Sequence, residues 1–368
     1  MLAADPASIA RGRAAFDRLE CARCHTHEGA SVEASRDCAG CHRAIHEGTY
    51  TREGVTTEMA TDFRAHVHHL VEVPRLDHLD GWLSREWVTR FLLAPHDVRP
   101  ALEETMPALP MSEDVAVDLA AFLVPSAARE PERSIADDDA AIERGRAHAE
   151  RLGCPSCHGF GTLWATPADG PALAPDLAHA RVRLQRDAIV GFLLDPSAAR
   201  PGTAMPRLVL DETTAREIAA FLVHAPLEEP APMAPFARLP PLTRDVTFEE
   251  IEERVLRRSC WHCHADESLA YGDGGPGNTG GFGFAPREVD LSSYTHVMSG
   301  ALDREGQHVS LFREIDGEPA LLRVLLARHD EVRGVIDPDV RGMPLGLPPL
   351  DAEQIQLIES WIAQGRPR

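Results

Sequence analysis

The stretch CARCHTHEGASVEASRDCAGCH, residues 21–42, places two Cys-x-x-Cys pairs in one short polar segment. Thirteen residues separate the two pairs, which is close to the spacing of a four-cysteine zinc ribbon. Each pair, however, is followed at once by a histidine, which a zinc ribbon does not require. The stretch therefore poses a choice between one metal clamp and two attachment points for a larger group.

Two further copies of the same five-residue pattern occur later in the chain, CPSCH at 154–158 and CWHCH at 260–264. The four copies together contain all eight cysteines of the 368-residue sequence. A zinc site would leave the four histidines unexplained and the last two pairs without partner cysteines nearby. Cys-x-x-Cys-His is the attachment signature of c-type haem, and we favour it over a zinc site or a thioredoxin-like redox pair.

The spacing within each motif fits the chemistry of haem attachment. Residues i, i+3 and i+4 lie on one face of a helical turn. Two thiols on that face can form thioethers with the two vinyl groups of a porphyrin, and the histidine then ligates the iron. We therefore predict four covalent haems c. The predicted attachment residues are Cys21, Cys24, Cys38, Cys41, Cys154, Cys157, Cys260 and Cys263, and the proximal ligands are His25, His42, His158 and His264.

The composition limits the partners and the compartment. There are 58 acidic and 37 basic side chains, a formal charge of -21, which argues against nucleic acid or an anionic membrane as a partner. Only 5% of residues are aromatic, and four porphyrins would supply the missing apolar bulk. No apolar run is long enough for a transmembrane helix, and the first residues do not resemble a signal peptide. Because haem is attached to this motif outside the bacterial cytoplasmic membrane, we expect a periplasmic or otherwise extracytoplasmic protein numbered from near its mature N-terminus.

The chain repeats one plan. RGRAAFDRLECARCH (11–25) matches RGRAHAERLGCPSCH (144–158), and FLLAPHDVRP (91–100) matches FLLDPSAARP (192–201). The offset falls from 133 to 101, so the first copy carries about 32 extra residues, which include the second haem motif. Each copy ends in a helix with an acidic first turn, for which Ser112 and Asp211 are the expected N-caps. A more diverged third copy has an insertion of similar length without cysteine.

These matches predict three domains and a linker. The predicted boundaries are 1–126 with two haems, 127–225 with one haem, a proline-rich linker at 226–245, and 246–368 with one haem. The third domain includes the glycine-rich stretch YGDGGPGNTGGFGF (271–284), which contains a formal G-x-G-x-x-G pattern. It does not lie between a strand and a helix, so we interpret it as a loop and not as a phosphate cradle.

The order of parts resembles a multihaem member of the class I cytochrome c family, over almost all of residues 8–368 as three successive modules. The resemblance implies an all-α fold of three tandem class I cytochrome c-like domains with loop insertions. In each module, the helix before the haem motif is expected to cross the closing helix. A Pro-x-Leu loop, at Pro74 or Pro175, is expected to place a backbone carbonyl near the proximal histidine. The third module lacks a clear loop of this kind.

A Met-Pro loop before each closing helix is the second feature that the resemblance carries. In the family, this loop supplies the sixth ligand of the iron, opposite the histidine. Carried over to this chain, the ligand pairs are His25 with Met106, His158 with Met205, and His264 with Met343. The alternative is that the methionines only fill gaps in a core. Three Met-Pro pairs at equivalent places favour ligation.

The inserted second haem has no Met-Pro loop of its own. Its proximal ligand is predicted to be His42, and the run FRAHVHHLVEVPRL (63–76) offers histidines for the sixth position. We predict His69, because the run leads directly into the Pro-x-Leu loop, although such a run could also be a solvated helix face. Two imidazoles would hold this iron at a lower potential than a histidine and a methionine. The other candidates are His66, His68, His46 and Met59.

Three classes of function follow. The first is an electron carrier between a redox protein donor and acceptor, either free or as a subunit of a larger, membrane-associated respiratory or photosynthetic complex. It would not be an enzyme, since six-coordinate irons leave no position for a substrate. The second is a haem enzyme, a peroxidase or sulfur-compound oxidoreductase, with one open iron at the inserted site or in the third module. The third, a zinc-stabilised interaction module, leaves the histidines unexplained.

Overall fold

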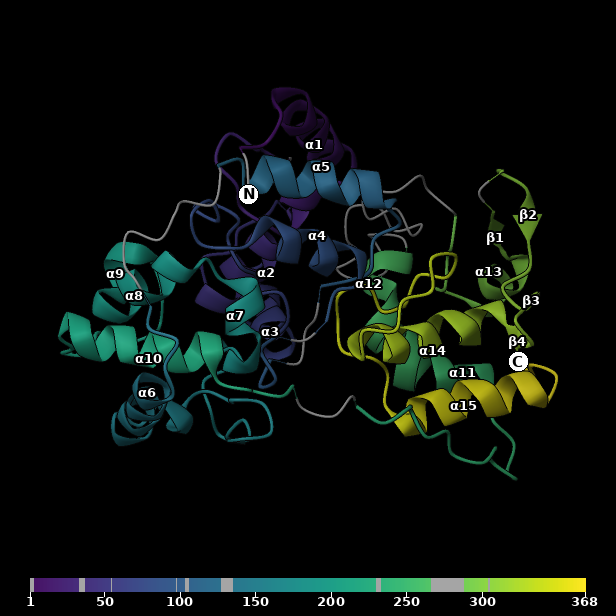
Figure 1. The fold of residues 1–368 in the computed structure, drawn as a ribbon. Helices are drawn as coiled ribbons and strands as arrows, with labels where there is room; N and C mark the ends of the chain where they lie inside the picture. Colours follow the sequence, from purple (N-terminus) through teal and green to yellow (C-terminus); the bar gives the residue numbers. More distant parts are fainter. Residues whose placement is uncertain are drawn as a thin grey trace. The chain divides into compact units, whose positions relative to one another are not determined.

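The structure is a computed structural model, and Figure 1 labels its elements. The described part of the chain is mainly helical, with two short two-stranded ribbons, so the expected all-α class is confirmed at that level. The glycine-rich stretch 271–284, predicted to be a loop, lies outside the described residues. The residues described are 3–32, 37–53, 55–96, 98–102, 106–126, 135–229, 233–265, 288–303 and 305–368.

The chain folds into two compact units, and the division falls inside α1 (Pro6–Arg18). One unit holds the CPSCH motif, and the other holds the remaining three motifs. The predicted domain boundaries at 126, 225 and 245 remain predictions. Unit 1 consists of Met1–Ala15, Leu76–Glu103 and Met111–Met233, and unit 2 of Phe16–Arg75, Glu104–Pro110 and Ala234–Arg368.

Polar side chains begin the main helices of unit 1. Ser84, Ser112, Asp138 and Asp211 each accept a hydrogen bond from a backbone N–H in the first turn of the following helix, as N-cap residues do. The predicted caps Ser112 and Asp211 are therefore confirmed. Besides the first part of α1, the elements are α4 (Arg85–Leu93), α5 (Glu113–Leu123), α6 (Asp139–Arg151), η3 (Cys154–Ser156), η4 (Leu177–His179), α7 (Ala180–Arg183), α8 (Arg186–Leu194), α9 (Pro196–Ala199) and α10 (Glu212–His224).

Two pairs of helices in unit 1 cross at a glycine, α1 with α5 and α6 with α10 (Figure 1). A Cβ added to Gly12 would lie 1.9 Å from the carbonyl oxygen of Asp118, and one added to Gly145 would lie 1.9 Å from that of Glu217. The backbones approach so closely that any side chain at these glycines would collide. In both of these repeats, the helix before the Cys-x-x-Cys-His motif thus crosses the closing helix. The residue before each glycine also forms an ion pair, Arg11 with Asp118 (2.7 Å) and Arg144 with Glu217 (2.7 Å).

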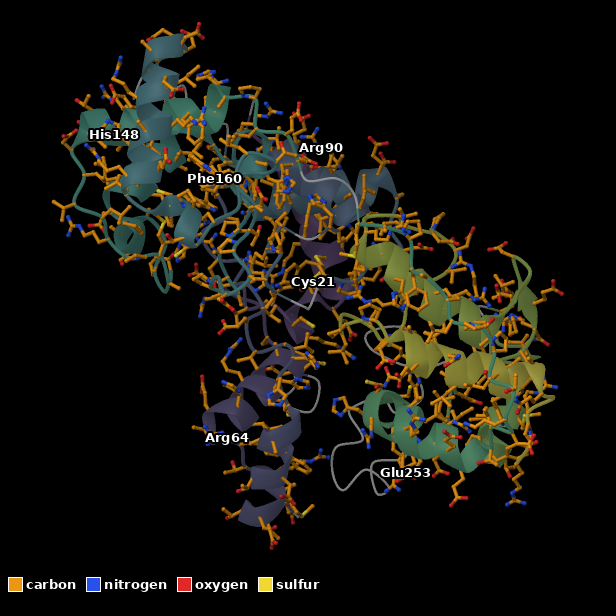
Figure 2. All side chains as sticks on the ribbon, turned by 90° about the horizontal axis from the view of Figure 1, so that it is seen from below. Cys21, Arg64, Arg90, His148, Phe160 and Glu253 are labelled. Carbon is orange, nitrogen blue, oxygen red and sulfur yellow. The ribbon has the colours of Figure 1, made fainter. Side chains whose placement is uncertain are left out.

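The core of unit 1 includes the fully buried Phe160, which is labelled in Figure 2. Its ring stacks on Phe221 of α10 and meets the edge of Trp164, with centroids 5.7 and 4.9 Å apart. Phe160 follows the CPSCH motif by only two residues. Packing of this aromatic group therefore fixes the turn that carries the motif against the closing helix α10.

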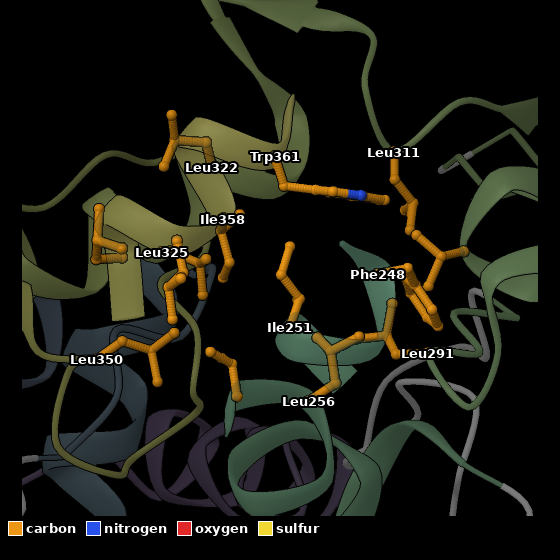
Figure 3. Close-up of a cluster of buried hydrophobic side chains, with 14 of the residues drawn as sticks. Phe248, Ile251, Leu256, Leu291, Leu311, Leu322, Leu325, Leu350, Ile358 and Trp361 are labelled. Carbon is orange, nitrogen blue, oxygen red and sulfur yellow. The ribbon is translucent and has the colours of Figure 1, made fainter. Parts of the chain in front are cut away.

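Unit 2 is built around a second core, in which α11, α14 and α15 turn apolar side chains toward one centre (Figure 3). Trp361 and Ile358 of α15 are 1% exposed, and Ile251 of α11 is 2% exposed. The elements are the last part of α1, η1 (Cys21–Arg23), α2 (Cys38–Glu47), α3 (Thr57–His66), α11 (Phe248–Ile251), η5 (Glu252–Cys260, a π-helix), α12 (Trp261–His264), α13 (Tyr294–Ser299), α14 (Ala320–Val332) and α15 (Ala352–Ala363).

Two short antiparallel ribbons in unit 2 were not predicted: β1 (Ala301–Leu302) with β2 (His308–Val309), and β3 (Glu314–Ile315) with β4 (Glu318–Pro319). The second ribbon turns at Asp316 and Gly317, whose φ angles are 53° and 82°. Two positive φ angles define the hairpin turn for which Asp-Gly is a preferred pair. The Asp-Gly dipeptide could therefore have predicted this turn from the sequence. It leads directly into α14, which lies beside the predicted ligand loop of the third module.

Candidate functional site

The four histidines that close the Cys-x-x-Cys-His motifs share one contact. In each, the ring Nδ1 lies within hydrogen-bonding distance of a backbone carbonyl oxygen from later in the chain. A carbonyl can only accept, so Nδ1 carries the proton and Nε2 is the basic nitrogen suited to bind a metal. The four Nδ1–O distances are 2.8 Å from His25 to Pro74, 2.7 Å from His42 to His69, 2.9 Å from His158 to Pro175, and 3.1 Å from His264 to Val289.

Two of these carbonyls belong to the expected Pro-x-Leu loops, so the predicted contacts of Pro74 and Pro175 are confirmed. The carbonyl of Val289 takes the same role in the third module, where no such loop was recognised. Val289 stands where the loop has proline, and Leu291 follows two residues later, as leucine does in the other two loops. That leucine was the signal that could have identified the segment.

The fourth contact changes the interpretation of His69. It was predicted as the sixth ligand of the inserted haem, but its carbonyl oxygen lies 2.7 Å from Nδ1 of His42. The main chain of His69 is therefore on the side of the proximal ring, whereas a sixth ligand must approach from the opposite side of the iron. This placement argues against His69 as that ligand and assigns it a different role, orienting His42.

The other candidates for that position are spread over α2, α3 and the segment that follows. His46 is exposed on α2, one turn after His42, so it projects from the same side of that helix. His68 is also exposed, and its Nε2 lies 3.0 Å from the carbonyl oxygen of Ala65. Met59 is half-buried on α3, and His66 is the last residue of the same helix. None of these placements identifies the sixth ligand.

The predicted Met ligands lie in the units that hold their partner histidines. Met106, Met205 and Met343 are half-buried, whereas Met233 and Met298, which lack a Met-Pro loop, are 61% and 38% exposed. Met205 packs against the same core as Cys154. Met343 packs against the same core as Cys260. Their ligation of iron remains a prediction.

A buried ion pair that sequence reasoning missed holds the Met343 loop. Arg328 of α14 is fully buried and lies 3.0 Å from Glu331, which is 3% exposed. The other oxygen of Glu331 accepts a hydrogen bond from the backbone N–H of Gly342 at 2.6 Å. Nε of Arg328 donates to the carbonyl of Leu347 at 2.9 Å. The loop is therefore fixed to α14 on both sides of Met343.

Burial shifts the pKa of several titratable groups of the motifs. Burial lowers the pKa of His25, His158 and His264 below the ordinary histidine value. Burial also raises the pKa of Cys21 to about 11 and that of Cys260 to about 12. The pKa of Cys24 is instead lowered, chiefly by its hydrogen bond with Cys38.

The donor arrangement also fails to form a zinc cluster. Across the described ranges, which include all eight cysteines, no group of three or more His, Cys, Asp or Glu side chains could hold a metal ion. None of the eight cysteines is in a disulfide. A haem site is compatible with both findings, because it needs one histidine and two separate thiols.

Unit 1 contains a cluster of partly buried arginines. Burial and two neighbouring cations, Arg99 and Arg200, lower the pKa of Arg183 to about 9. The guanidinium groups of Arg183 and Arg200 lie over Trp87 and Trp82, 5.3 and 5.6 Å from the ring centroids. Nε of Arg183 is buried without a hydrogen-bond partner among the residues the structure describes. Positive charge gathered in this way in an acidic protein matches an anionic group such as a propionate.

No helix in the described residues is long and apolar enough to cross a membrane. No protein-family model, curated protein or solved structure matches the chain.

Proposed function

We propose that the chain is a tetrahaem c-type cytochrome that carries electrons between redox proteins. The observation that carries this proposal is the contact shared by the four motif histidines. Each donates from Nδ1 to a backbone carbonyl, although their four partner segments differ in sequence. Such an outer contact fixes the ring orientation and makes Nε2 a better metal ligand. Four unrelated histidines are not expected to share it by chance.

The residues present fit four haems, held by the cysteine pairs and proximal histidines named above. When bound, each haem supplies an iron that gains or loses one electron. The chain's own residues would orient the four imidazoles. They also bury His25, His158 and His264, which lowers the pKa of these rings, and such burial tunes the potential. In three sites, Met106, Met205 and Met343 would complete the coordination and raise the potential further. No substrate position is needed for such a protein.

The helix crossings support a fold like that of class I cytochromes c. In both repeats of this pattern, the helix before the motif crosses the closing helix at a glycine, Gly12 or Gly145, that leaves no room for a side chain. In the third module, Ile251 and Trp361 pack in one core and join the corresponding helices, without a glycine. In all three modules, the helix before the motif thus packs against the closing helix. Two modules do so through a glycine at the crossing, and the third does so through large apolar side chains.

The donor and acceptor are proposed to be redox proteins outside the bacterial cytoplasm, because thioether attachment takes place there. The chain would act free or as a subunit of a membrane-associated complex. Its formal charge of -21 favours partners with a basic docking surface at low salt. One alternative, a haem enzyme, is kept because the placement of His69 leaves the inserted site without an identified sixth ligand.

A coulometric titration of the full-length protein, followed by visible spectroscopy, tests the proposal. We expect reversible uptake of four electron equivalents per chain. After one cycle of reduction and reoxidation, adding peroxide to the oxidised protein should not change its visible spectrum. A protein without a redox-active chromophore would refute electron transfer. Rapid, stoichiometric peroxide consumption would instead favour the enzyme. Met233→Leu, at an exposed methionine outside the Met-Pro loops, is the control and should titrate like the unmutated chain.

A further inference from the structure

The proposed function leaves one iron, that of the inserted haem, without an identified sixth ligand. An imidazole that lies beside the proximal histidine of this site belongs to another motif. The ring of His262 lies 5.7 Å from the ring of His42, centroid to centroid, with 64° between the planes. Both residues are in unit 2, although they lie 220 positions apart in the sequence.

We propose that His262 of the CWHCH motif is the sixth ligand of the iron held by His42. This inference rests on the proposed function, since it requires a haem at His42. Two imidazoles on opposite sides of one metal, each with a metal–nitrogen bond of about 2 Å, place their ring centroids about 6 Å apart. The observed separation is close to that value. Rings that share an axis can take any angle between their planes, so 64° is compatible.

The position of His262 within its own motif makes it available to another iron. It lies on α12 between the attachment residues Cys260 and Cys263 and two residues before the proximal ligand His264. Residues two apart point to opposite sides of a helix. The side chain of His262 therefore projects away from the side that carries His264. It cannot reach the far side of the haem of its own motif.

The orientation of His42 is compatible with a ligand from another segment. The carbonyl of His69 occupies Nδ1 of His42, so Nε2 points away from the segment that contains His69.

Ligation by His262 would give the inserted haem two imidazoles and join it to the third module. The ligand would be covalently continuous with Cys263, which holds the next haem. Electrons could then pass from one site to the other through a few bonds of α12. A carrier with this arrangement has no open iron at the inserted site. The unidentified sixth ligand at that site would then no longer favour an enzyme.

The alternative is that the two rings are only an edge-to-face packing pair. A phenylalanine preserves such packing and removes the ligand nitrogen, so His262→Phe separates the two explanations. His66→Phe and Met59→Leu, in α3, are the matched variants for the other candidates. Each is made in the full-length protein, and the number of covalent haems is measured by mass for every variant.

The readouts are the spin state of the ferric protein and carbon monoxide binding by the reduced protein. We expect the unmutated chain to be fully low-spin and not to bind carbon monoxide. His262→Phe should keep four haems, become high-spin at one of them and bind one carbon monoxide per chain, while the α3 variants stay unchanged. A low-spin His262→Phe protein with four haems that excludes carbon monoxide overturns the inference, as does binding by the unmutated chain.

A second variant keeps the inference testable if His262→Phe does not accumulate. His262→Met retains a ligand but replaces an imidazole by a thioether, which raises the potential of a haem. We expect one of the four potentials to rise and three to stay. Four unchanged potentials would overturn the inference. A chain without any covalent haem would refute the proposed function itself, which is a different result from all of these.

Discussion

Replacing Glu331 by alanine should unfold or loosen the loop that carries Met343. Glu331 is 3% exposed and contacts the fully buried Arg328 at 3.0 Å. It also accepts the N–H of Gly342 at 2.6 Å, one residue before the predicted iron ligand. The substitution leaves a buried guanidinium without its carboxylate and a buried N–H without its acceptor.

The expected loss of stability follows from these two contacts. Breaking a buried ion pair by removing one partner costs about 3–5 kcal/mol, because the remaining charge stays buried and uncompensated. The orphaned N–H of Gly342 adds to this, although the two effects overlap and are not summed. Asp330→Ala is the matched control, since Asp330 lies next to Glu331 and pairs with Arg333 at 2.8 Å but is 43% exposed. A pair of that kind contributes about 0–1 kcal/mol.

Two measurements on the full-length protein check this prediction. Denaturant unfolding gives the free-energy change, and the charge-transfer band of methionine-ligated ferric haem reports the Met343 bond. We expect Glu331→Ala to lose about one third of the intensity of that band, because Met343 is one of the three predicted methionine ligands. Asp330→Ala should retain the full intensity under the same conditions. If both variants have the same stability and the same band, the buried pair does not hold the loop, and the reasoning is wrong.

Three further predictions follow from single sites. Gly145→Ala should lower the free energy of unfolding in urea by about 1–3 kcal/mol, because its Cβ would lie 1.9 Å from the carbonyl oxygen of Glu217. Gly191→Ala is the control and should be neutral or stabilising, because a Cβ added there has no atom within 4 Å. Equal effects of the two substitutions would contradict the close crossing. Met205→His should lower one haem potential in a redox titration and leave the others in place, whereas four unchanged potentials would show that this methionine only packs. Burial lowers the pKa of His329, so the unfolded state takes up its proton first as the pH falls through about 6.5. Stability contributed by this neutral ring is thus present above that pH and lost below it. The denaturant midpoint of unfolding should therefore decrease less between about pH 7.5 and 5.5 in His329→Gln than in the unmutated protein. An equal decrease in both proteins would refute this prediction.

Local patterns predicted several contacts of the site. The spacing of Pro74 and Pro175 from their leucines identified two of the four carbonyls, and the acidic or hydroxyl residue before each closing helix identified the caps Ser112 and Asp211. These features depend on a few consecutive residues, so they can be recognised without the fold. The turn at 316–317 was equally local and was overlooked.

Contacts between distant segments could not be predicted in this way. Nothing in the CWHCH motif indicates that His262 lies beside His42, because that contact depends on how the inserted segment packs within unit 2. The ion pair of Arg328 and Glu331 is similar: its spacing is common on exposed helices, and only tertiary packing makes it buried. The contact of the His69 carbonyl with His42 was not predicted for the same reason, since the sequence of this histidine run does not show which way each residue faces.

The mass of the denatured full-length protein tests the central claim most directly. The polypeptide alone has a mass of 40.2 kDa. We predict this mass plus four haem increments, retained after denaturation, with no thiol that reacts with an alkylating reagent. A protein expressed where haem c is attached that instead shows the bare polypeptide mass, eight alkylated cysteines or bound zinc would contradict the account.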